Sequence, residues 1–136
     1  MEDSTIKAKY VYEGDIDNIY NISQLSNNSA KISPAPFVLI PTLGERLDYS
    51  FSFPNKSRVI IRIFDISGKF ITSLLDQYYE QAATVIRDDY HSSWDGKDQL
   101  GQIVSPGTYI MHIEAMNPIT GQTYTDSAPI VVGVKN

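Results

Sequence analysis

The sequence predicts an all-β fold, an antiparallel sandwich of about seven strands. Three observations support this prediction: apolar residues alternate with a period of two, the alternating segments are short, and turn residues separate them without helical segments in between. The chain has 136 residues, of which 42% are hydrophobic and 20% charged, as expected for one domain with one core. It has no cysteine, and a domain of this length needs no disulfide for stability.

Residues 47–53 form the clearest strand, because their apolar side chains occupy every other position and therefore share one face. These side chains are Leu47, Tyr49, Phe51 and Phe53. Residues 59–66 are apolar on both faces except at Arg62, which is typical of a central strand covered on both sides. Gly68 then supplies the positive φ of a tight turn, and residues 69–75 return as the partner strand.

The pattern is weaker in the middle of the chain. Residues 76–83 predict a helical turn or a surface loop, and residues 83–87 predict a short strand. Residues 108–116 and 123–134 are strong strand segments, joined by a turn that contains a proline and a glycine. With residues 37–41 counted as a further strand, the total reaches about seven.

Three successive turn signals follow Trp94 within one segment, residues 94–109. Asp-Gly, a lone glycine and Pro-Gly mark places where the backbone reverses, while the apolar residues among them can point into a core. We therefore expect Trp94 to pack in the core, although loop aromatics also serve as ligand platforms in other proteins. The polar and small residues of this segment that shape its turns are Asp95, Gly96, Asp98, Gly101, Pro106 and Gly107.

Three segments together resemble the bacterial Ig-like module of the flagellar hook-cap protein FlgD: IRIFDISGKFITSL, then WDGKDQLGQIVSPGTYIMHIEA, then PIVVGVKN. The joint occurrence of FDxxGK and WDGxDxxGxxVxxGxY is the most specific part. The resemblance covers residues 33–136 and implies an Ig-like antiparallel β-sandwich, while residues 1–32 are expected to be an N-terminal strand and linker. It implies structural roles for the motif residues Asp65, Gly68, Trp94, Asp95, Gly96, Asp98, Gly101, Pro106, Gly107 and Tyr109.

The resemblance also implies a function. Close relatives of this module lie at the extreme C-terminus of large exported proteins in Bacteroidetes-like bacteria, where they resemble type IX secretion sorting and anchoring domains. A non-catalytic structural or interaction module for sorting, anchoring or adhesion is therefore expected, secreted or on the cell surface. We expect its partner to be a protein: secretion or surface machinery, a neighbouring domain or a second copy.

A calcium-binding, Asn- and Asp-rich loop often precedes the second strand in that family. Here the corresponding stretch reads SPAPFVLIPTLGERLD and lacks these carboxylates, so no calcium site is expected.

The charge balance excludes other classes of partner. The net charge is -5, the pI is near 4.8 and no run of basic residues occurs, so a nucleic-acid partner is not expected. The apolar runs are too short for a transmembrane helix. The N-terminus, MEDSTIKAKY, lacks the basic and then apolar character of an export signal, which favours a piece of a larger protein whose signal lies elsewhere.

The titratable residues form no catalytic set. His91 and His112 have no nearby nucleophile motif, and the Asp88-Asp89 pair would face opposite ways in a strand. Asp95 and Asp98, with that pair, offer carboxylates to a metal, but aspartates are also preferred in turns because their side chains bond the backbone. We therefore expect no enzyme activity, no cofactor and no metal site.

A carbohydrate site is an alternative binding function. The chain has nine tyrosines, and exposed aromatic rings on β-sandwiches can stack on the sugar rings of a polysaccharide. A tyrosine also suits a half-buried strand or loop position whose hydroxyl reaches water. The candidates for ligand or partner contact are Tyr78, Tyr79, Tyr90 and His91.

The N-terminal segment supports a further alternative. Residues 6–12 alternate like a strand, with Lys7 and Lys9 opposite the apolar positions Ile6, Ala8, Tyr10 and Tyr12. The later stretch NISQLSNNSAKIS has the composition of a linker, long enough to let this strand leave its own domain. Donation of the strand to a neighbouring copy would build a filament. Alternatively, the segment pairs within its own sandwich or is the tail of a preceding domain.

Overall fold

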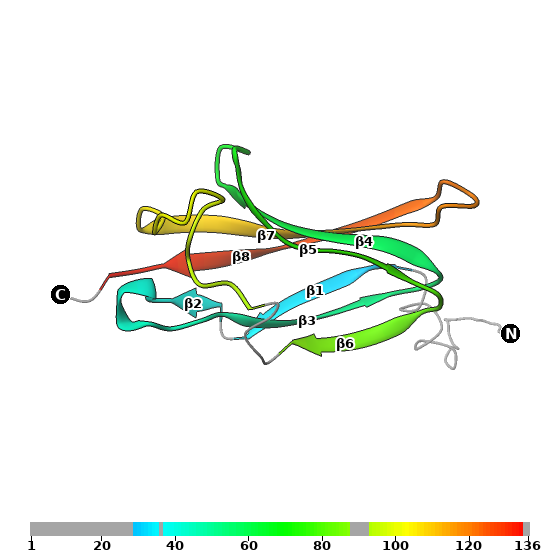
Figure 1. The fold of residues 1–136 in the computed structure, drawn as a ribbon, viewed down its shortest axis with the longest axis horizontal. Helices are drawn as coiled ribbons and strands as arrows, with labels where there is room; N and C mark the ends of the chain where they lie inside the picture. The colour runs from blue at the N-terminus through cyan, green and yellow to red at the C-terminus, as the bar shows by residue number, and fades with distance from the viewer. Residues whose placement is uncertain (1–28, 36, 88–92, 135–136) are drawn as a thin grey trace, which may run out of the picture.

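Two β-sheets pack face to face (Figure 1). The computed structural model describes residues 29–35, 37–87 and 93–134. The strand order is β1-β3-β6 in the small sheet and β2-β8-β7-β4-β5 in the large sheet. These residues contain no α-helix, so the predicted all-β sandwich is confirmed, with eight strands in the described part of the chain. The elements are β1 (Lys31–Ala35), β2 (Val38–Leu39), the 3-10 helix η1 (Pro41–Leu43), β3 (Asp48–Phe53), β4 (Ser57–Asp65), β5 (Phe70–Tyr79), β6 (Ala83–Arg87), β7 (Gly107–Met116) and β8 (Thr123–Val132).

The core lies between the two sheets. On β3, the alternating apolar side chains are buried as the sequence predicts. On β4, Val59, Ile61 and Ile63 are fully buried, and the strand pairs with β5 on one side and β7 on the other. β4 is therefore the central strand expected from its apolar run. The other large, fully buried side chains come from β2, β7, β8 and residue 94, and include Leu39, Met111, Ile113, Ile130 and Trp94.

β5 is longer than predicted. Residues 76–79 continue the strand instead of forming a helical turn or loop, because they pair with β4 from Ser57↔Tyr79 onward. A bidentate ion pair supports this polar end, since the Arg58 guanidinium donates to both carboxylate oxygens of Asp76 at 2.9 and 2.7 Å. Two irregularities in the register with β4 interrupt the alternation of β5, which weakens its sequence pattern.

The first two strands also differ from the prediction. β1 begins at Lys31, inside the stretch expected to be a linker and two residues before the expected start of the domain. Residues 37–41 are expected from the sequence to form one strand. Only Val38 and Leu39 do so, as the two-residue β2, and Pro41 is the first residue of η1. β2 runs parallel to the end of β8, so one strand pair departs from the otherwise antiparallel arrangement. The Ile32 amide of β1 donates to the Asp126 carboxylate of β8 at 2.9 Å, which joins the two sheets along one side.

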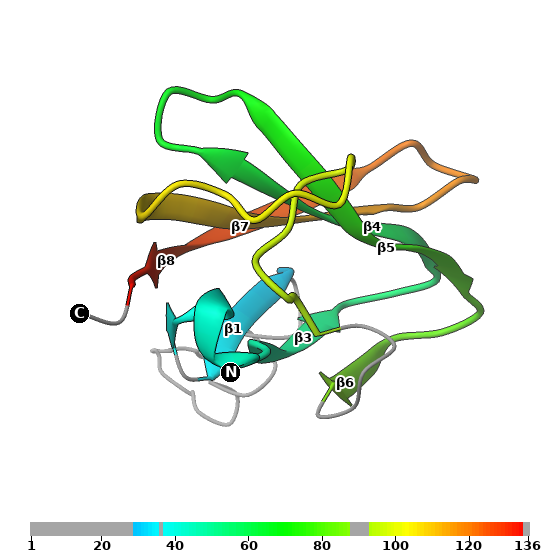
Figure 2. The ribbon, with the colours of Figure 1, turned by 60° about the vertical axis from the view of Figure 1, so that its left-hand side comes forward.

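The sandwich has two ends with different contents (Figures 1 and 2). We call the loop end the one formed by residues 37–47, 65–70, 93–107 and 131–134. The hairpin end carries the β3–β4, β5–β6 and β7–β8 turns. Among the described residues, no helix has the length and apolar character needed to cross a membrane.

Candidate functional site

All three sequence segments that resemble the FlgD module meet at the loop end. The turn after β4, the 93–107 segment and the last residues of β8 come from distant parts of the chain, yet they lie together at one end (Figure 2). β2 joins them by pairing with Val131 and Val132. The most specific residues of the sequence thus build one surface of the sandwich.

The turn after β4 is fixed by the Asp65 carboxylate. One oxygen of Asp65 accepts hydrogen bonds from the Ser67 amide at 2.9 Å, the Ser67 hydroxyl at 2.7 Å and the Lys69 amide at 2.9 Å. Gly68 adopts φ 92°, as the turn requires. The Ser67 hydroxyl, the backbone amides and the Lys69 charge hold the pKa of the Asp65 carboxyl below its ordinary value, because they favour the ionised form.

Trp94 anchors the long segment in the core. Its side chain is 1% exposed, and its backbone forms an isolated bridge with Leu47 through hydrogen bonds of 2.7 and 3.0 Å. The indole Nε1–H donates to the Lys97 carbonyl at 3.0 Å. Trp94 therefore belongs to the core, as the sequence predicts, and also holds the first turn of its loop.

The two aspartates of this loop bond to the backbone. Asp95 accepts the Lys97 amide at 3.1 Å, and Asp98 accepts the amides of Leu100 and Gln102 at 2.9 and 3.0 Å. These are the Asx-type turns expected from the sequence, in which one oxygen of each carboxylate accepts the backbone amides. The Asp88-Asp89 pair, the remaining part of the metal hypothesis, lies outside the described residues.

Gly96 permits a close approach between distant segments. A Cβ at this position would lie 2.3 Å from Pro41 Cγ and 2.8 Å from Pro41 Cβ, and Gly96 has φ 79°. The loop therefore packs directly against η1. Further along, Pro106 and Gly107 lead into β7, where the Tyr109 hydroxyl donates to the Ser105 carbonyl at 2.6 Å. This contact has the form of a tyrosine corner, a bond from a strand tyrosine to the backbone a few residues upstream.

Arg46 is a residue of this end that the sequence analysis missed. Its Nε donates to the Ser93 hydroxyl at 2.7 Å, its Nη2 donates to the Ser93 carbonyl at 3.0 Å, and its Nη1 lies 3.9 Å from the Asp95 carboxylate. No spacing rule links residue 46 to residue 93, so only the fold reveals the contact. Beside it, a polar hollow of 330 Å³ lies between β5 and residues 93–101.

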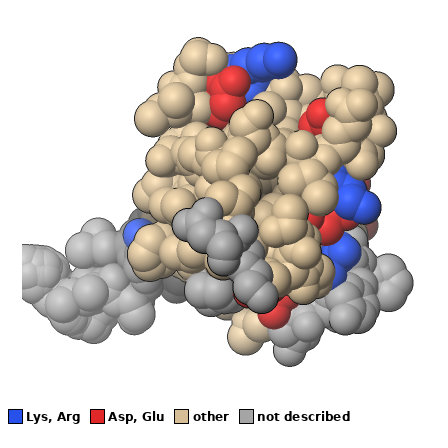
Figure 3. Space-filling model, turned by 90° about the vertical axis from the view of Figure 1, so that its left-hand side faces the viewer, with Lys and Arg blue, Asp and Glu red and all other residues tan. Residues whose placement is uncertain are grey.

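Most of the exposed large apolar side chains also lie at the loop end. Ile66 is 76% exposed and Leu100 is 79% exposed, both at the tips of turns held by aspartates. Figure 3 views this end and shows the Lys, Arg, Asp and Glu residues mainly toward the periphery, with other residues over most of the described surface. The apolar residues are Phe37, Val38, Leu43, Ile66, Phe70, Leu100, Ile103, Val131 and Val134.

The outer face of the large sheet is charged instead. Besides the Arg58–Asp76 pair, Arg62 lies 3.4 Å from Glu114. His112, expected to face solvent, does lie on this face but is half-buried, with its ring 6.0 Å from the Phe64 ring. Its Nδ1 has no hydrogen-bond partner among the described residues.

The two predicted aromatic candidates that the structure describes, Tyr78 and Tyr79, face opposite ways. Tyr78 is 44% exposed, whereas the next residue, Tyr79, points inward and packs 4.9 Å from Phe53. Consecutive residues of a strand face opposite ways, and the sequence analysis missed this because it expected no strand here. Tyr90 and His91 lie outside the described residues. So do the apolar positions of the N-terminal strand, Ile6, Ala8, Tyr10 and Tyr12.

These features define a class of protein domain: a two-sheet β-sandwich of the FlgD type, with its signature loops gathered at one end. The crystal structure of FlgD from P. aeruginosa is similar, with a TM-score of 0.52 and 23% sequence identity. The likeness covers 74% of this chain and 66% of the FlgD chain, just under two thirds of that protein. The FlgD-like β fold expected from the sequence is thereby confirmed. No protein-family model and no curated protein matches the chain.

Proposed function

We propose that this chain is a non-catalytic interaction module of a larger exported bacterial protein, and that it sorts or anchors that protein through its loop end. The observation that supports the proposal is the coincidence of two features on one surface. The residues that resemble the FlgD module and most of the exposed large apolar side chains both lie there. Exposed large apolar side chains that gather at one end of a domain favour a role in protein–protein contact.

The loops of this end are ordered before any partner arrives. Asp65 and Asp98 each bond to two backbone amides of their own turns, and Gln99 donates its amide to the Ile71 carbonyl at 3.0 Å. Preorganisation of this kind lowers the entropy lost on binding. Ile66 and Leu100 therefore project from turns whose backbone is held by hydrogen bonds, and they can serve as apolar anchors.

The chemistry of the surface also favours one kind of partner. Because most of the exposed large apolar side chains of the described residues lie at this end and charged residues lie mainly at its periphery, a matching partner presents an apolar protein surface, not a nucleic acid or a strongly charged groove. Secretion machinery, a surface protein or a neighbouring domain of the same protein fits that description. The likeness to FlgD supports a module of this type, since it establishes the fold that carries these loops.

The test compares substitutions at the two ends of the sandwich. The protein that carries this chain is expressed in its own bacterium with Ile66→Asp and Leu100→Asp together, or with Ile119→Asp as the control. Ile119 is 75% exposed, which matches Ile66 at 76% and Leu100 at 79%, but it lies in the β7–β8 turn at the hairpin end. All three side chains are exposed, so each change is expected to alter stability by less than about 0.5 kcal/mol.

The two roles give different results in cell fractions. A sorting role predicts that the double variant stays inside the cell, and an anchoring role predicts that it is exported but lost to the medium. Under either role the Ile119→Asp protein behaves like the parent. If all three proteins distribute identically, or if Ile119→Asp has the same effect as the double variant, the loop end is not the functional surface.

A further inference from the structure

β6 leaves an unprotected edge on the small sheet. The strand pairs with β3 along one side, and among the described residues no strand pairs with its other side. Ile86 is 72% exposed, and β6 contains no proline and only one charged residue, Arg87 at its end. Exposed edges of this kind pair readily with another strand, so native proteins usually protect or cover them.

β1 and the start of β5, which also lie at sheet edges, are better protected. β1 contains Lys31 and Pro34 and is tied to β8 through Asp126. At the loop end, the start of β5 receives the Gln99 amide at its Ile71 carbonyl. On the free side of β6 no such protection occurs among the described residues, which makes this edge suited to accept a further strand.

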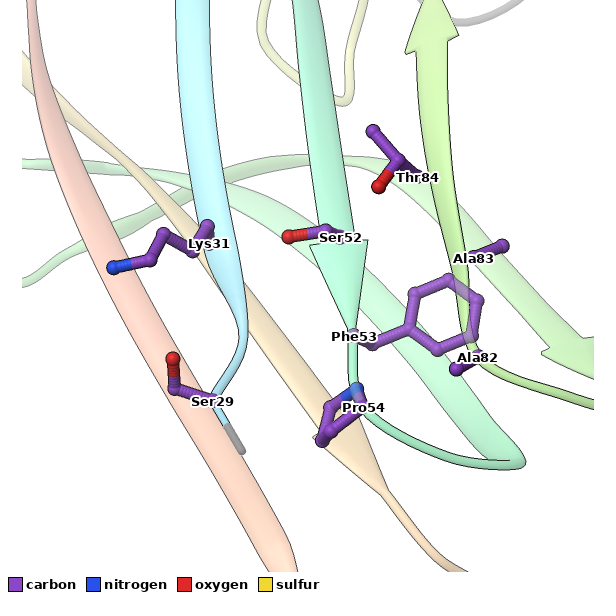
Figure 4. Close-up of a pocket in the computed structure, with 8 residues that line it drawn as sticks. All are labelled: Ser29, Lys31, Ser52, Phe53, Pro54, Ala82, Ala83 and Thr84. Atoms are coloured by element: carbon purple, nitrogen blue, oxygen red, sulfur yellow. The ribbon is translucent and has the colours of Figure 1, made fainter. Parts of the chain in front are cut away.

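A hollow of 480 Å³ leads from the start of β1 to this edge (Figure 4). It lies across the hairpin end of the small sheet and is lined by side chains of all three strands or of residues that flank them. Most of these side chains are small, which leaves room above the sheet for a covering segment. The lining residues in the strands are Lys31 of β1, Ser52 and Phe53 of β3, and Ala83 and Thr84 of β6, and those that flank the strands are Ser29, Pro54 and Ala82.

The hollow begins where the rest of the chain joins the domain. Ser29 lines it, and residues 1–28 precede Ser29. We propose that residues 6–12 of the same chain pair with the free side of β6 as a fourth strand of the small sheet, and that the connecting residues lie across the hollow. This inference goes beyond the proposed function and does not depend on it.

The segment between residues 12 and 31 is long enough to cross the small sheet, and the strand directions allow it to do so. Residues 13–30 reach about 60 Å at ~3.3 Å per residue, whereas the new strand lies three strand spacings, about 14 Å, from β1. Lys31 pairs with Ser52 and Ala83 pairs with Phe53, so β1 and β6 begin at the same end. A strand antiparallel to β6 therefore finishes at that end, beside the hollow.

The side-chain pattern fits the same arrangement. Ala83 and Val85 of β6 are half-buried against the rim of the core, whereas Thr84 and Ile86 face out. The apolar face of residues 6–12 extends that rim, and Lys7 and Lys9 fall on the solvent side. Pairing within one chain is favoured over exchange between copies, because a short tether gives an effective concentration in the millimolar range.

The experiment measures amide hydrogen exchange of β6 by NMR. Alternate amides of an antiparallel strand point away from its partner, so those of β6 that point away from β3 report on the free side. The full chain is compared with residues 29–136, with Ala8→Pro, and with Ser23→Pro as the matched control. Proline removes a ladder hydrogen bond in a strand but is tolerated in a connecting segment.

We expect these amides to exchange at least about tenfold more slowly in the full chain and in Ser23→Pro than in the other two proteins, at every protein concentration. The β4 amides serve as an internal check that each protein is folded. If the shortened chain unfolds, the comparison of Ala8→Pro with Ser23→Pro decides alone. Equal exchange in all folded proteins overturns the proposal. Protection that appears only at high concentration, together with a larger mass by light scattering, also overturns it and shows instead that a second copy donates the strand.

Discussion

The rings of Trp94 and Tyr109 meet edge to face, with centroids 5.8 Å apart and planes at 64°. Each residue also bonds to the backbone of the loop between them, Trp94 at the Lys97 carbonyl and Tyr109 at the Ser105 carbonyl. The two rings thus lie in or against the core, while their polar atoms hold the two ends of one loop. An aromatic pair of this geometry contributes ~0.5–1.5 kcal/mol beyond the area it buries.

Replacing Trp94 tests the first of these anchors. Trp94→Ala is expected to lower the free energy of unfolding by about 3–5 kcal/mol, because it leaves a large cavity in the core. Trp94→Phe keeps an aromatic ring but loses the donor to Lys97, so it costs less than the alanine change. Urea unfolding measures both changes, and the single tryptophan reports its own environment by fluorescence. A Trp94→Phe protein as stable as the parent, with exposed indole emission in the parent, would contradict the core assignment.

Tyr109→Phe tests the second anchor. The change removes only the hydroxyl that donates to Ser105, so the expected loss of unfolding free energy is about 0.5–1.5 kcal/mol. Burial raises the pKa of the Tyr109 hydroxyl, which keeps it protonated as a donor through neutral pH. Tyr78→Phe, at an exposed site, is the control and is expected to change stability by less than about 0.5 kcal/mol. Equal losses in the two variants would show that the Ser105 bond contributes nothing specific.

The strands that the sequence predicts well are those with a local pattern. β3 alternates strictly and β4 is apolar on both faces, while β6, in a part of the chain with a weaker pattern, matches its predicted range because three of its five residues are β-branched. β1 is not predicted because it contains a proline, and the end of β5 is not predicted because it is polar. β1 is a strand through its pairing with β3, and the end of β5 through its pairing with β4. Edge pairing of that kind depends on long-range neighbours that a local pattern does not record.

The same distinction applies to the loop end. Asp65, Asp95 and Asp98 hold their own turns, so turn chemistry alone places them. Arg46 and Pro41 contact residues about fifty positions away, and nothing in the spacing of the chain indicates those contacts. The convergence of the motif segments follows from the sheet order, which places the start of β7, the end of β8 and the turn after β4 at one end.

Two glycines in the same loop form a matched pair for mutation. Gly96 and Gly101 have φ of 79° and 83°, so alanine at either position bears the left-handed strain of about 1–2 kcal/mol. At Gly101 a Cβ meets nothing within 4 Å, whereas at Gly96 it would overlap Pro41. Gly96→Ala is therefore expected to be less stable than Gly101→Ala by a further ~1–3 kcal/mol in urea unfolding. Similar stabilities for the two variants would refute the close approach of the loop to η1.

The last prediction concerns the response of the turn after β4 to acid. The pKa of Asp65 lies below its ordinary value of 3.8, chiefly because the Ser67 hydroxyl donates to the carboxylate. A carboxyl with a lowered pKa in the folded state contributes stability that is complete above the ordinary pKa and disappears as the pH falls through the folded pKa. The parent is therefore expected to lose stability below about pH 4 by an amount that Asp65→Asn, which cannot ionise, does not lose.

Two measurements separate the cause from the consequence. Carboxyl NMR titration follows Asp65 directly, and Ser67→Ala is expected to move its pKa back toward 3.8, because the first cause of the shift is removed. Urea unfolding between about pH 2 and 6 then compares the parent with Asp65→Asn. The difference between their free energies of unfolding is expected to shrink as the pH falls. If Ser67→Ala leaves the titration unchanged, the hydroxyl is not the source of the shift. If the stability difference stays constant with pH, the Asp65 side chain holds the turn by a means other than its charge.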